Sequence, residues 1–361
     1  MKYIDEFRDL KISGKLAGLI KKEAEGLSPV NFMEVCGTHT MAVERFGIRR
    51  MLPDNVKLIS GPGCPVCVTP KDYIDKAIAV SNLENIIVFS FGDMLKVPGT
   101  NSTLLRERPK GRVRVAYSAL DAAEFAEKNQ DKKIVFLGIG FETTAPTVGS
   151  SVKYAKKKRI KNFFVYSGHK VMPPAMRLLA GDKDINVKGF LCPAHVSAII
   201  GMKPYGVISE KYNIPCVISG FEPLDILQSI LMLVRQVKAN KAKVENQYNR
   251  VVKFSGNTMA IRLMEEVFSI RDSEWRGIGN IPKSGLCLSK RYEDFDAEKN
   301  IDFPKVITRQ DKGCICGSVL KGVKTPLDCA LFAKKCSPDN PIGACMVSSE
   351  GACAAYYRYR K

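Results

Sequence analysis

The sequence lacks long apolar runs and an N-terminal export signal. None of its apolar stretches approaches the roughly 18 residues that a membrane-spanning helix needs, so we expect no membrane role. The first residues, MKYIDEFRDLKI, alternate charged and apolar side chains and contain no hydrophobic core of a signal peptide. These two absences predict a cytoplasmic protein.

Acidic residues are few relative to basic ones. Lys and Arg number 56 against 37 Asp and Glu, which gives a net charge of +19 and raises the question of nucleic-acid binding. The basic residues are dispersed, and no basic stripe interleaved with aromatic residues is present. We therefore expect no nucleic-acid partner. An anionic protein or a metal–thiolate partner fits the charge as well, because net charge bears on association and not on fold.

Cysteine, in contrast, is abundant. The chain has 361 residues, enough for two or three domains, and 12 of them are cysteines. Disulfides are rare in a reducing compartment, so the cysteines are expected to serve metal binding or thiol redox chemistry.

The stretch 56–70, VKLISGPGCPVCVTP, has the strongest local pattern. A β-branched run predicts a buried strand, which Gly61-Pro62-Gly63 ends, and a helix is expected from about Asp72. Cys64 and Cys67 lie on the turn between them, where two thiols can reach each other or one metal. A nearby helix N-terminus favours the thiolate form. Half of a structural zinc site, or an unremarkable cysteine pair in a turn, remains the alternative.

Predicted strands alternate with helical segments from residue 30 to about 238, which predicts parallel sheets in two α/β units. Unusual polar residues follow nearly every strand. Because the carboxyl ends of parallel strands open on one edge, these residues are expected to face one cleft between the two units. They are Cys36, His39, Cys64, Cys67, Asp93, Glu142, His169, His195 and Glu222.

Each of these residues also has a purely structural interpretation. His169 and His195 can be buried structural histidines. Glu142 and Glu222 can simply occupy the first turn of a helix, where the helix dipole favours a carboxylate. Lys170, next to a histidine, can be a solvated charge.

The composition changes beyond residue 245. A helix over Thr258–Phe268 is expected, followed by a loop-rich stretch that contains Trp275. The tail then holds Cys314, Cys316, Cys329, Cys336, Cys345 and Cys353. Six cysteines within 40 residues indicate a metal site. Their wide spacing is unlike the paired knuckles of most zinc sites and favours a [4Fe–4S] cluster, with zinc as the alternative.

Six blocks of the sequence together resemble the HypD-type family of [NiFe]-hydrogenase maturation proteins. The blocks are FMEVCGTHT (32–40), GPGCPVCVTP (61–70), GFETTAPT (140–147), SGHKVMPPAM (167–176), FLCPAH (190–195) and PIGACMVSSEGACAAYYRY (341–359). The resemblance covers nearly the whole chain. It implies two α/β domains that face a cleft and a third domain with a [4Fe–4S] cluster.

The resemblance also implies roles for single residues. Cys36 is the expected ligand of an iron that becomes Fe(CN)2CO, with His39 beside it, and Cys64 and Cys67 form a redox-active dithiol. The cluster pattern C-x14-C-x6-C-x16-C falls on Cys314, Cys329, Cys336 and Cys353. Cys316 competes with Cys314 for the first ligand position, and Cys345 is left over as a structural residue.

Further expectations combine the resemblance with the chemistry of cyanide and CO as ligands. Thr38, His39 or Lys170 are expected to hydrogen-bond to iron-bound cyanide, and Glu142 or Glu222 to donate protons. The predicted partners are a small HypC-type chaperone, which shares the iron through its own cysteine, and a HypE-type cyanide donor with a HypF-type protein upstream. The predicted domains are 28–118 and 119–245, both α/β, and 1–27 with 246–361 for the iron–sulfur domain.

Three classes of function follow. A maturation scaffold uses Cys36, the dithiol and the cluster. A stand-alone iron–sulfur dithiol oxidoreductase, resembling ferredoxin-dependent thioredoxin reductases, leaves Cys36 and His39 without a role. A zinc-stabilised binding module leaves the strand-end residues unexplained. The scaffold is preferred on the family resemblance, and the sequence does not decide whether it turns over as an enzyme.

Overall fold

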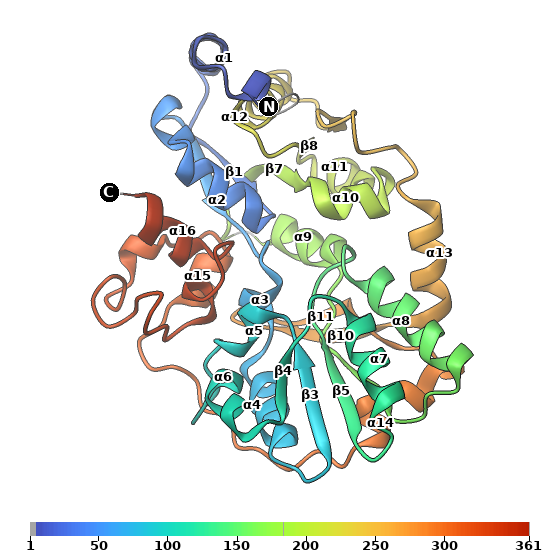
Figure 1. Ribbon diagram of the computed structural model, residues 1–361. Helices are drawn as coiled ribbons and strands as arrows, with labels where there is room; N and C mark the ends of the chain where they lie inside the picture. Colours follow the sequence, from blue (N-terminus) through green and yellow to red (C-terminus); the bar gives the residue numbers. More distant parts are fainter. Residues whose placement is uncertain (1–4, 183, 361) are drawn as a thin grey trace.

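The computed structural model describes residues 5–182 and 184–360. Residues 1–4 and 361 of the predicted iron–sulfur domain, and Lys183 of the predicted second α/β domain, lie outside the described residues. Within these ranges the chain forms two parallel β-sheets with helices around them, and the predicted α/β class is confirmed (Figure 1).

Sheet A has the strand order β2-β1-β7-β8-β9, and sheet B has the order β4-β3-β5-β6. Neighbouring strands are parallel in both sheets. The strands are β1 (Val30–Glu34), β2 (Val56–Ser60), β3 (Ile86–Ser90), β4 (Val113–Val115), β5 (Lys133–Gly138), β6 (Phe163–Ser167), β7 (Val187–Pro193), β8 (Cys216–Ser219) and β9 (Val244–Asn246). β6 and β8 are buried along their whole length, as expected for strands that have helices on both faces.

Helices connect the strands. They are α1 (Leu10–Ala24), α2 (Gly37–Arg45), α3 (Pro65–Val68), α4 (Lys71–Ser81), α5 (Gly92–Leu95), α6 (Leu104–Glu107), α7 (Ala119–Lys128), α8 (Ala145–Lys158), α9 (Met172–Gly181), α10 (Ala194–Ile200), α11 (Gly206–Tyr212), α12 (Pro223–Lys238) and α13 (Thr258–Val267). Single 3-10 turns are η1 (Asp5–Arg8), η2 (Ile48–Met51), η3 (Arg108–Lys110), η4 (Lys203–Tyr205) and η5 (Lys290–Phe295). No helix among the described residues is long and apolar enough to cross a membrane.

The chain enters sheet A, leaves it and returns. β1 and β2 belong to sheet A, β3 to β6 form sheet B, and β7 to β9 complete sheet A. The range 28–118 therefore contributes strands to both sheets, and the predicted boundary between residues 118 and 119 falls within sheet B. The local alternation of strand and helix is the same in both sheets, so the sequence pattern does not reveal which strands pair.

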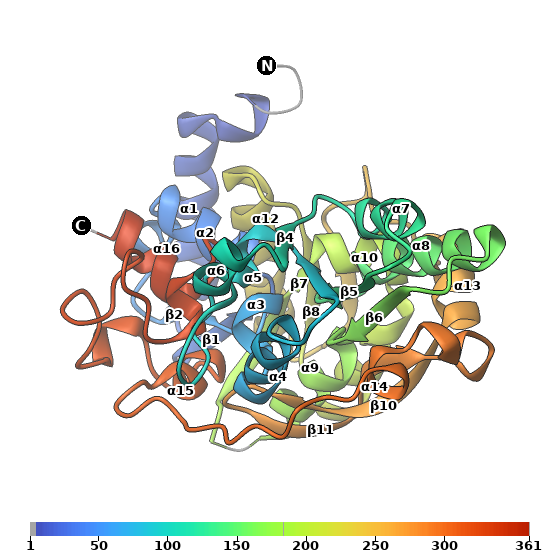
Figure 2. The ribbon, with the colours of Figure 1, turned by 60° about the horizontal axis from the view of Figure 1, so that its bottom comes forward.

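We predicted a loop-rich stretch around Trp275, and this prediction is wrong. β10 (Phe268–Trp275) and β11 (Gly279–Leu288) form an antiparallel hairpin that packs against α9 (Figure 2). Pro282 and Gly285 in β11 suggested a loop, but the register shifts opposite Asp272, and this bulge accommodates the proline. Trp275 is fully buried, and its indole N–H donates to Ser284 Oγ at 2.8 Å.

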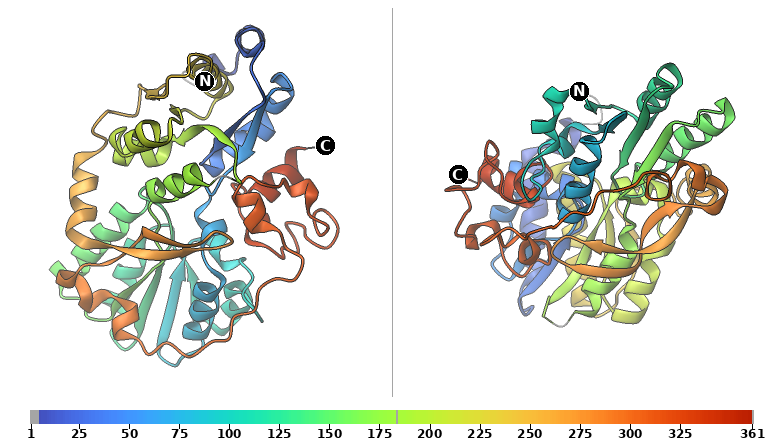
Figure 3. Two further views of the ribbon diagram at one scale, coloured as in Figure 1. Left: turned by 180° about the vertical axis from the view of Figure 1, so that it is seen from behind. Right: turned by 90° about the horizontal axis from the view of Figure 1, so that it is seen from below.

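After the hairpin and α14 (Ala297–Asn300), the cysteine-rich tail consists of short helices joined by loops. These are α15 (Cys316–Leu320), η6 (Pro326–Asp328), η7 (Ala344–Met346) and α16 (Ala352–Tyr359). The tail folds back on the first part of the chain: α16 packs against α2, and η7 packs against α3 (Figure 3). The loops after β1 and β2 are thereby brought next to the tail cysteines.

Candidate metal and thiol site

Cys36 lies two residues after the end of β1 and is the N-cap of α2. The neighbouring strand β2 ends in the Gly61-Pro62-Gly63 turn, and Gly37 N–H donates to Gly63 O at 3.0 Å. A Cβ atom on Gly63 would lie 2.3 Å from Cys36 N, so only glycine permits this approach. Cys36 and the Cys64 turn are therefore held side by side.

Cys64 is the N-cap of the short helix α3, and Cys67 lies within that helix. The Cys64 thiol accepts a hydrogen bond from Cys67 N–H at 3.3 Å, and the two thiols contact each other. Both side chains are buried. Burial also raises the pKa of Cys67 well above its usual value, which opposes the thiolate-favouring effect that we predicted for a helix N-terminus. In this environment the Cys67 thiol is protonated until a partner group compensates the charge.

Contacts between thiols extend from the dithiol into the cysteine-rich tail. The Cys67 thiol contacts the Cys345 thiol, and Cys345 in turn contacts Cys316. We call Cys64, Cys67, Cys345 and Cys316 the thiol series. We interpreted Cys345 as a left-over structural residue, and its position between Cys67 and Cys316 was not expected because these residues are distant in the sequence.

Five tail cysteines line one small cavity of about 20 Å³: Cys314, Cys316, Cys329, Cys336 and Cys353. The other lining side chains are largely apolar and include Ile315, Leu331, Phe332 and Met346. No group of three or more His, Cys, Asp or Glu side chains within the described ranges is close enough to hold a single metal ion. Soft thiols around an apolar cavity are the donor set that a [4Fe–4S] cluster requires, so the residues present fit that group.

His39 lies in the first turns of α2 and is fully buried. Burial lowers its pKa to about 4, so the imidazole is neutral at pH 7. Its Nε2 lies 3.0 Å from Ser219 O and 3.1 Å from Gly220 O, which makes Nε2–H the donor. Nδ1 is then an acceptor, and it is buried without a partner.

The loop after β8 places an aromatic ring between two histidines. The Phe221 ring centroid lies 4.9 Å from that of His39 and 4.3 Å from that of His195. Burial also lowers the pKa of His195. Glu222 follows on the same loop, but its carboxylate is bound by the Arg8 guanidinium, with Arg8 Nη2 to Glu222 Oε1 at 2.8 Å.

Glu350 is a site residue that our sequence reasoning missed. It comes from the tail, and its Oε1 accepts a hydrogen bond from Thr38 Oγ1 at 2.7 Å. Burial, and then the nearby Glu350 carboxylate, raise the pKa of the Cys36 thiol to about 12. The only sequence signal is its position in the block that also contains Cys345 and Cys353.

Glu142, His169 and Lys170 belong to a second group, at the end of sheet B. Glu142 Oε1 accepts from Met172 N–H at 2.9 Å, and burial raises the Glu142 pKa to about 7. Burial lowers the pKa of His169 to about 3. Lys170 Nζ donates to Ser273 Oγ of the hairpin at 2.5 Å. Among the described residues, no interaction of Lys170 reaches Cys36.

The contacts of the predicted residues fall into two groups. Those after the sheet A strands gather around Cys36 and the dithiol, whereas those after β5 and β6 face α9 and the hairpin. Asp93, after β3, is exposed in the first turn of α5.

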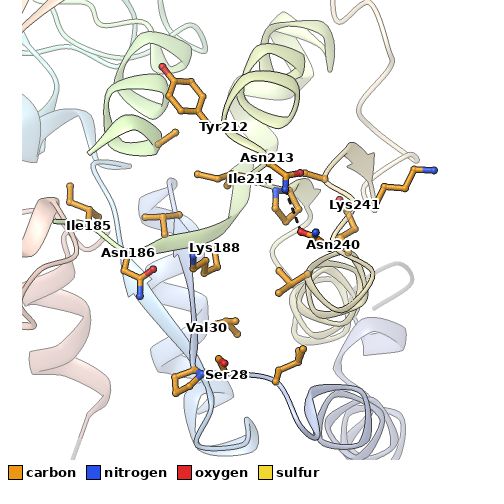
Figure 4. A pocket seen from close by; sticks show the side chains of 18 of the residues that line it. Ser28, Val30, Ile185, Asn186, Lys188, Tyr212, Asn213, Ile214, Asn240 and Lys241 are labelled. Carbon is orange, nitrogen blue, oxygen red and sulfur yellow. Dashed lines mark hydrogen bonds between the residues drawn. The ribbon is translucent and has the colours of Figure 1, made fainter. Parts of the chain in front are cut away.

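A cavity of about 640 Å³ lies at the opposite, amino-terminal edge of sheet A (Figure 4). Its lining residues include Val30, Lys188 and Ile214, at or next to the starts of β1, β7 and β8. None of the predicted site residues lines it. The C-terminal ends of α9, α11 and α12 also contribute residues to the lining of this cavity. The chemistry-bearing side chains thus concentrate at the carboxyl ends of the strands.

The fold and the site define a cysteine-rich α/β protein in which a buried cysteine pair lies near a cavity lined by five further cysteines. A family model named HypD and described as "Hydrogenase formation hypA family" matches residues 11–360. The chain belongs to the HypD family.

Curated relatives agree with this assignment. The chain is 46% identical to hydrogenase maturation factor HypD2 of Bradyrhizobium diazoefficiens, over 99% of this chain and 97% of the relative. It is 44% identical to HypD of Cupriavidus necator over the same shares, and 42% identical to HypD of Escherichia coli over 100% and 99%. The resemblance noted in the sequence is confirmed.

Proposed function

We propose that this protein is the scaffold on which the iron of [NiFe]-hydrogenase acquires its cyanide and CO ligands. The observation that carries the proposal is the position of Cys36. Its thiol lies beside the Cys64 turn and near His39, whose Nδ1 is a buried acceptor without a partner. A thiolate with polar groups around it suits the binding of an iron that carries cyanide and CO, the Fe(CN)2CO cargo.

Cys36 supplies one ligand to this iron, and a cysteine of a HypC-type partner supplies another. The high pKa of Cys36 means that iron binding must release a proton, because the thiolate and not the thiol binds the metal. The Thr38 hydroxyl lies against the Cys36 thiol and donates its one hydrogen to Glu350, so it would orient a cyanide ligand only by turning away from that carboxylate. Lys170, expected in the same role, is held by the hairpin instead.

The dithiol supplies reducing equivalents. A Cys64–Cys67 disulfide takes up two electrons and two protons and yields two thiols, and the reverse reaction delivers two electrons. Cys329, Cys336 and Cys353, with Cys314 or Cys316, are the residues that would hold a [4Fe–4S] cluster. Such a cluster, when bound, supplies electrons one at a time. Cys345 and Cys316 link that cavity to Cys67 by contact.

Glu142 remains a candidate proton donor on the strength of its pKa of about 7, which suits proton transfer near neutral pH. Glu222 is a weaker candidate because Arg8 binds its carboxylate. Full maturation activity of a protein in which both glutamates are Gln would eliminate both. Cyanide is delivered by a HypE-type protein that is supplied by a HypF-type protein.

A stand-alone iron–sulfur dithiol oxidoreductase is the second candidate. The thiol series favours it, since contacts from Cys67 to the tail cavity require no iron at Cys36. This candidate leaves Cys36 and His39 without a function.

The test is anaerobic co-purification with the small partner, followed by infrared spectroscopy and by iron and zinc analysis. The scaffold predicts bands of metal-bound cyanide and CO and about five irons per complex, one more than a four-iron cluster. Cys36→Ala should lose the bands and keep about four irons. Cys287→Ala, a half-buried cysteine on the hairpin, is the matched control and should keep both. Four irons without bands in the wild type would favour the oxidoreductase, and zinc alone would contradict both functions.

A further inference from the structure

A second cavity, of about 370 Å³, opens beside the cavity of the five cysteines. Four residues line both cavities: Cys314, Ile315, Cys316 and Gly343. One layer of residues therefore separates the predicted cluster position from this second cavity. We call the second cavity the basic pocket, for the charges described next.

The basic pocket is lined by two cations, Arg276 and Lys321, and by the polar residues Gln310 and Ser318. Its one acidic residue, Asp311, is bound by Lys71 through an ion pair of 2.5 Å. The cationic charge of the pocket is thus not neutralised from within. The surrounding sequence adds to it, because residues 305–361 contain ten Lys and Arg against four Asp and Glu.

Arg276 is held in place by the segment that follows the dithiol. Its backbone N–H donates to Val68 O at 2.8 Å, and its Nε donates to Thr69 O at 2.7 Å. Nη2 is buried without a partner. The next residue, Gly277, has a φ of +73°, and a Cβ there would lie 2.3 Å from Gly317 Cα. The hairpin turn is therefore seated directly on the segment of Cys314 and Cys316, and both sides of the pocket are fixed by close packing.

We infer that the basic pocket is the docking site of an acidic protein that carries one electron at a time. Opposite charge steers such encounters, and electron-transfer interfaces are small and transient. Each encounter would pass one electron from the partner to a cluster held by the tail cysteines. Two encounters, with two protons from water, match the reduction of one Cys64–Cys67 disulfide. The inference rests on the proposed function, since it requires the cluster.

The test uses the cluster-loaded protein and, as probe, a plant-type [2Fe–2S] ferredoxin, which is an acidic carrier of single electrons. Binding is measured by calorimetry at low and high salt, and electron transfer by anaerobic stopped flow. Lys321→Glu should weaken binding about tenfold at low salt, and Lys321→Met should weaken it less. Lys157→Glu on α8 is exposed, makes the same change of charge and should bind as the wild type does.

Dithionite separates failure of the inference from failure of the proposed function. It should reduce the cluster equally in the wild type and in all variants. A wild type without four irons or dithionite-reducible absorbance contradicts the cluster itself. Equal affinity of Lys321→Glu and Lys157→Glu for the ferredoxin overturns the docking site. A third outcome would also overturn the docking site. If the wild type binds inorganic phosphate but not ferredoxin, and Lys321→Glu abolishes phosphate binding, the basic pocket is a small-anion site.

Discussion

The two parallel sheets have similar strand orders, but the loops at the carboxyl ends of their strands hold different side chains. The loops after β1, β2 and β8 hold Cys36, Cys64, Cys67 and His39 against each other and against the tail. The loops after β5 and β6 hold Glu142, His169 and Lys170 against α9 and the hairpin. The difference lies in what covers each edge: the cysteine-rich tail covers sheet A, and the hairpin covers sheet B. The residues that lie against a strand-end loop therefore decide its chemistry as much as the loop itself.

The largest expected loss of stability comes from Arg49, which joins sheet A to the tail. Its guanidinium pairs with the buried carboxylates of Glu34 and Glu44 and lies 5.6 Å from the Tyr356 ring centroid of α16. Arg49→Leu should lower the free energy of unfolding by about 3 to 5 kcal/mol, because both carboxylates lose their partner. The control, Arg235→Leu, breaks an exposed pair with Glu23 and should cost less than about 1 kcal/mol. Urea denaturation measures both, and equal losses would contradict the role of Arg49.

A pH-dependent effect distinguishes the sheet B group. The Glu142 pKa is about 7 in the folded chain against its ordinary 4.5, so the folded state binds this proton more tightly than the unfolded state. Wild-type stability should therefore fall as pH rises between these values, by up to about 3 kcal/mol. Glu142→Gln keeps an acceptor for Met172 N–H and should escape the loss. Its advantage over the wild type in urea denaturation should grow from pH 4 to pH 8. A constant difference would contradict the burial effect.

Two glycine substitutions compare the carboxyl-terminal edge of sheet A directly with that of sheet B. Gly63→Ala places a Cβ against the Cys36 backbone and should destabilise the protein by about 1 to 3 kcal/mol. Gly92→Ala, at the first residue of α5 shortly after β3, meets nothing within 4 Å and should change stability little. Thermal unfolding of the two variants gives the comparison. The Gly63→Ala complex should also lose infrared intensity, since Cys36 is displaced.

The smallest effect is expected at Lys170. Its amine is bound by Ser273, and burial lowers its pKa to about 8. Lys170→Met should leave the cyanide frequencies of the complex unchanged, whereas Thr38→Val should shift them because the hydroxyl beside Cys36 is lost. A shift in Lys170→Met equal to that in Thr38→Val would place the lysine at the iron after all.

The sequence determined the strands and most helices, and it supplied the candidate residues for metal and thiol chemistry. Alternation of β-branched strands with helical segments is local, and so are a C-x-x-C turn and a tail with six cysteines. These features depend on neighbours along the chain, which explains why β8 (Cys216–Ser219) and α12 (to Lys238) end as predicted.

Only the tertiary structure decided which residues meet. The pairing of β1 with β7 joins segments more than 150 residues apart, and nothing in either strand specifies its partner. The same holds for the contact of Cys67 with Cys345, for Glu350 beside Cys36, and for the hairpin that holds Lys170. Long-range contacts arise from how whole surfaces pack. Single motifs therefore identify candidate residues, and the packed chain selects which of them lie together.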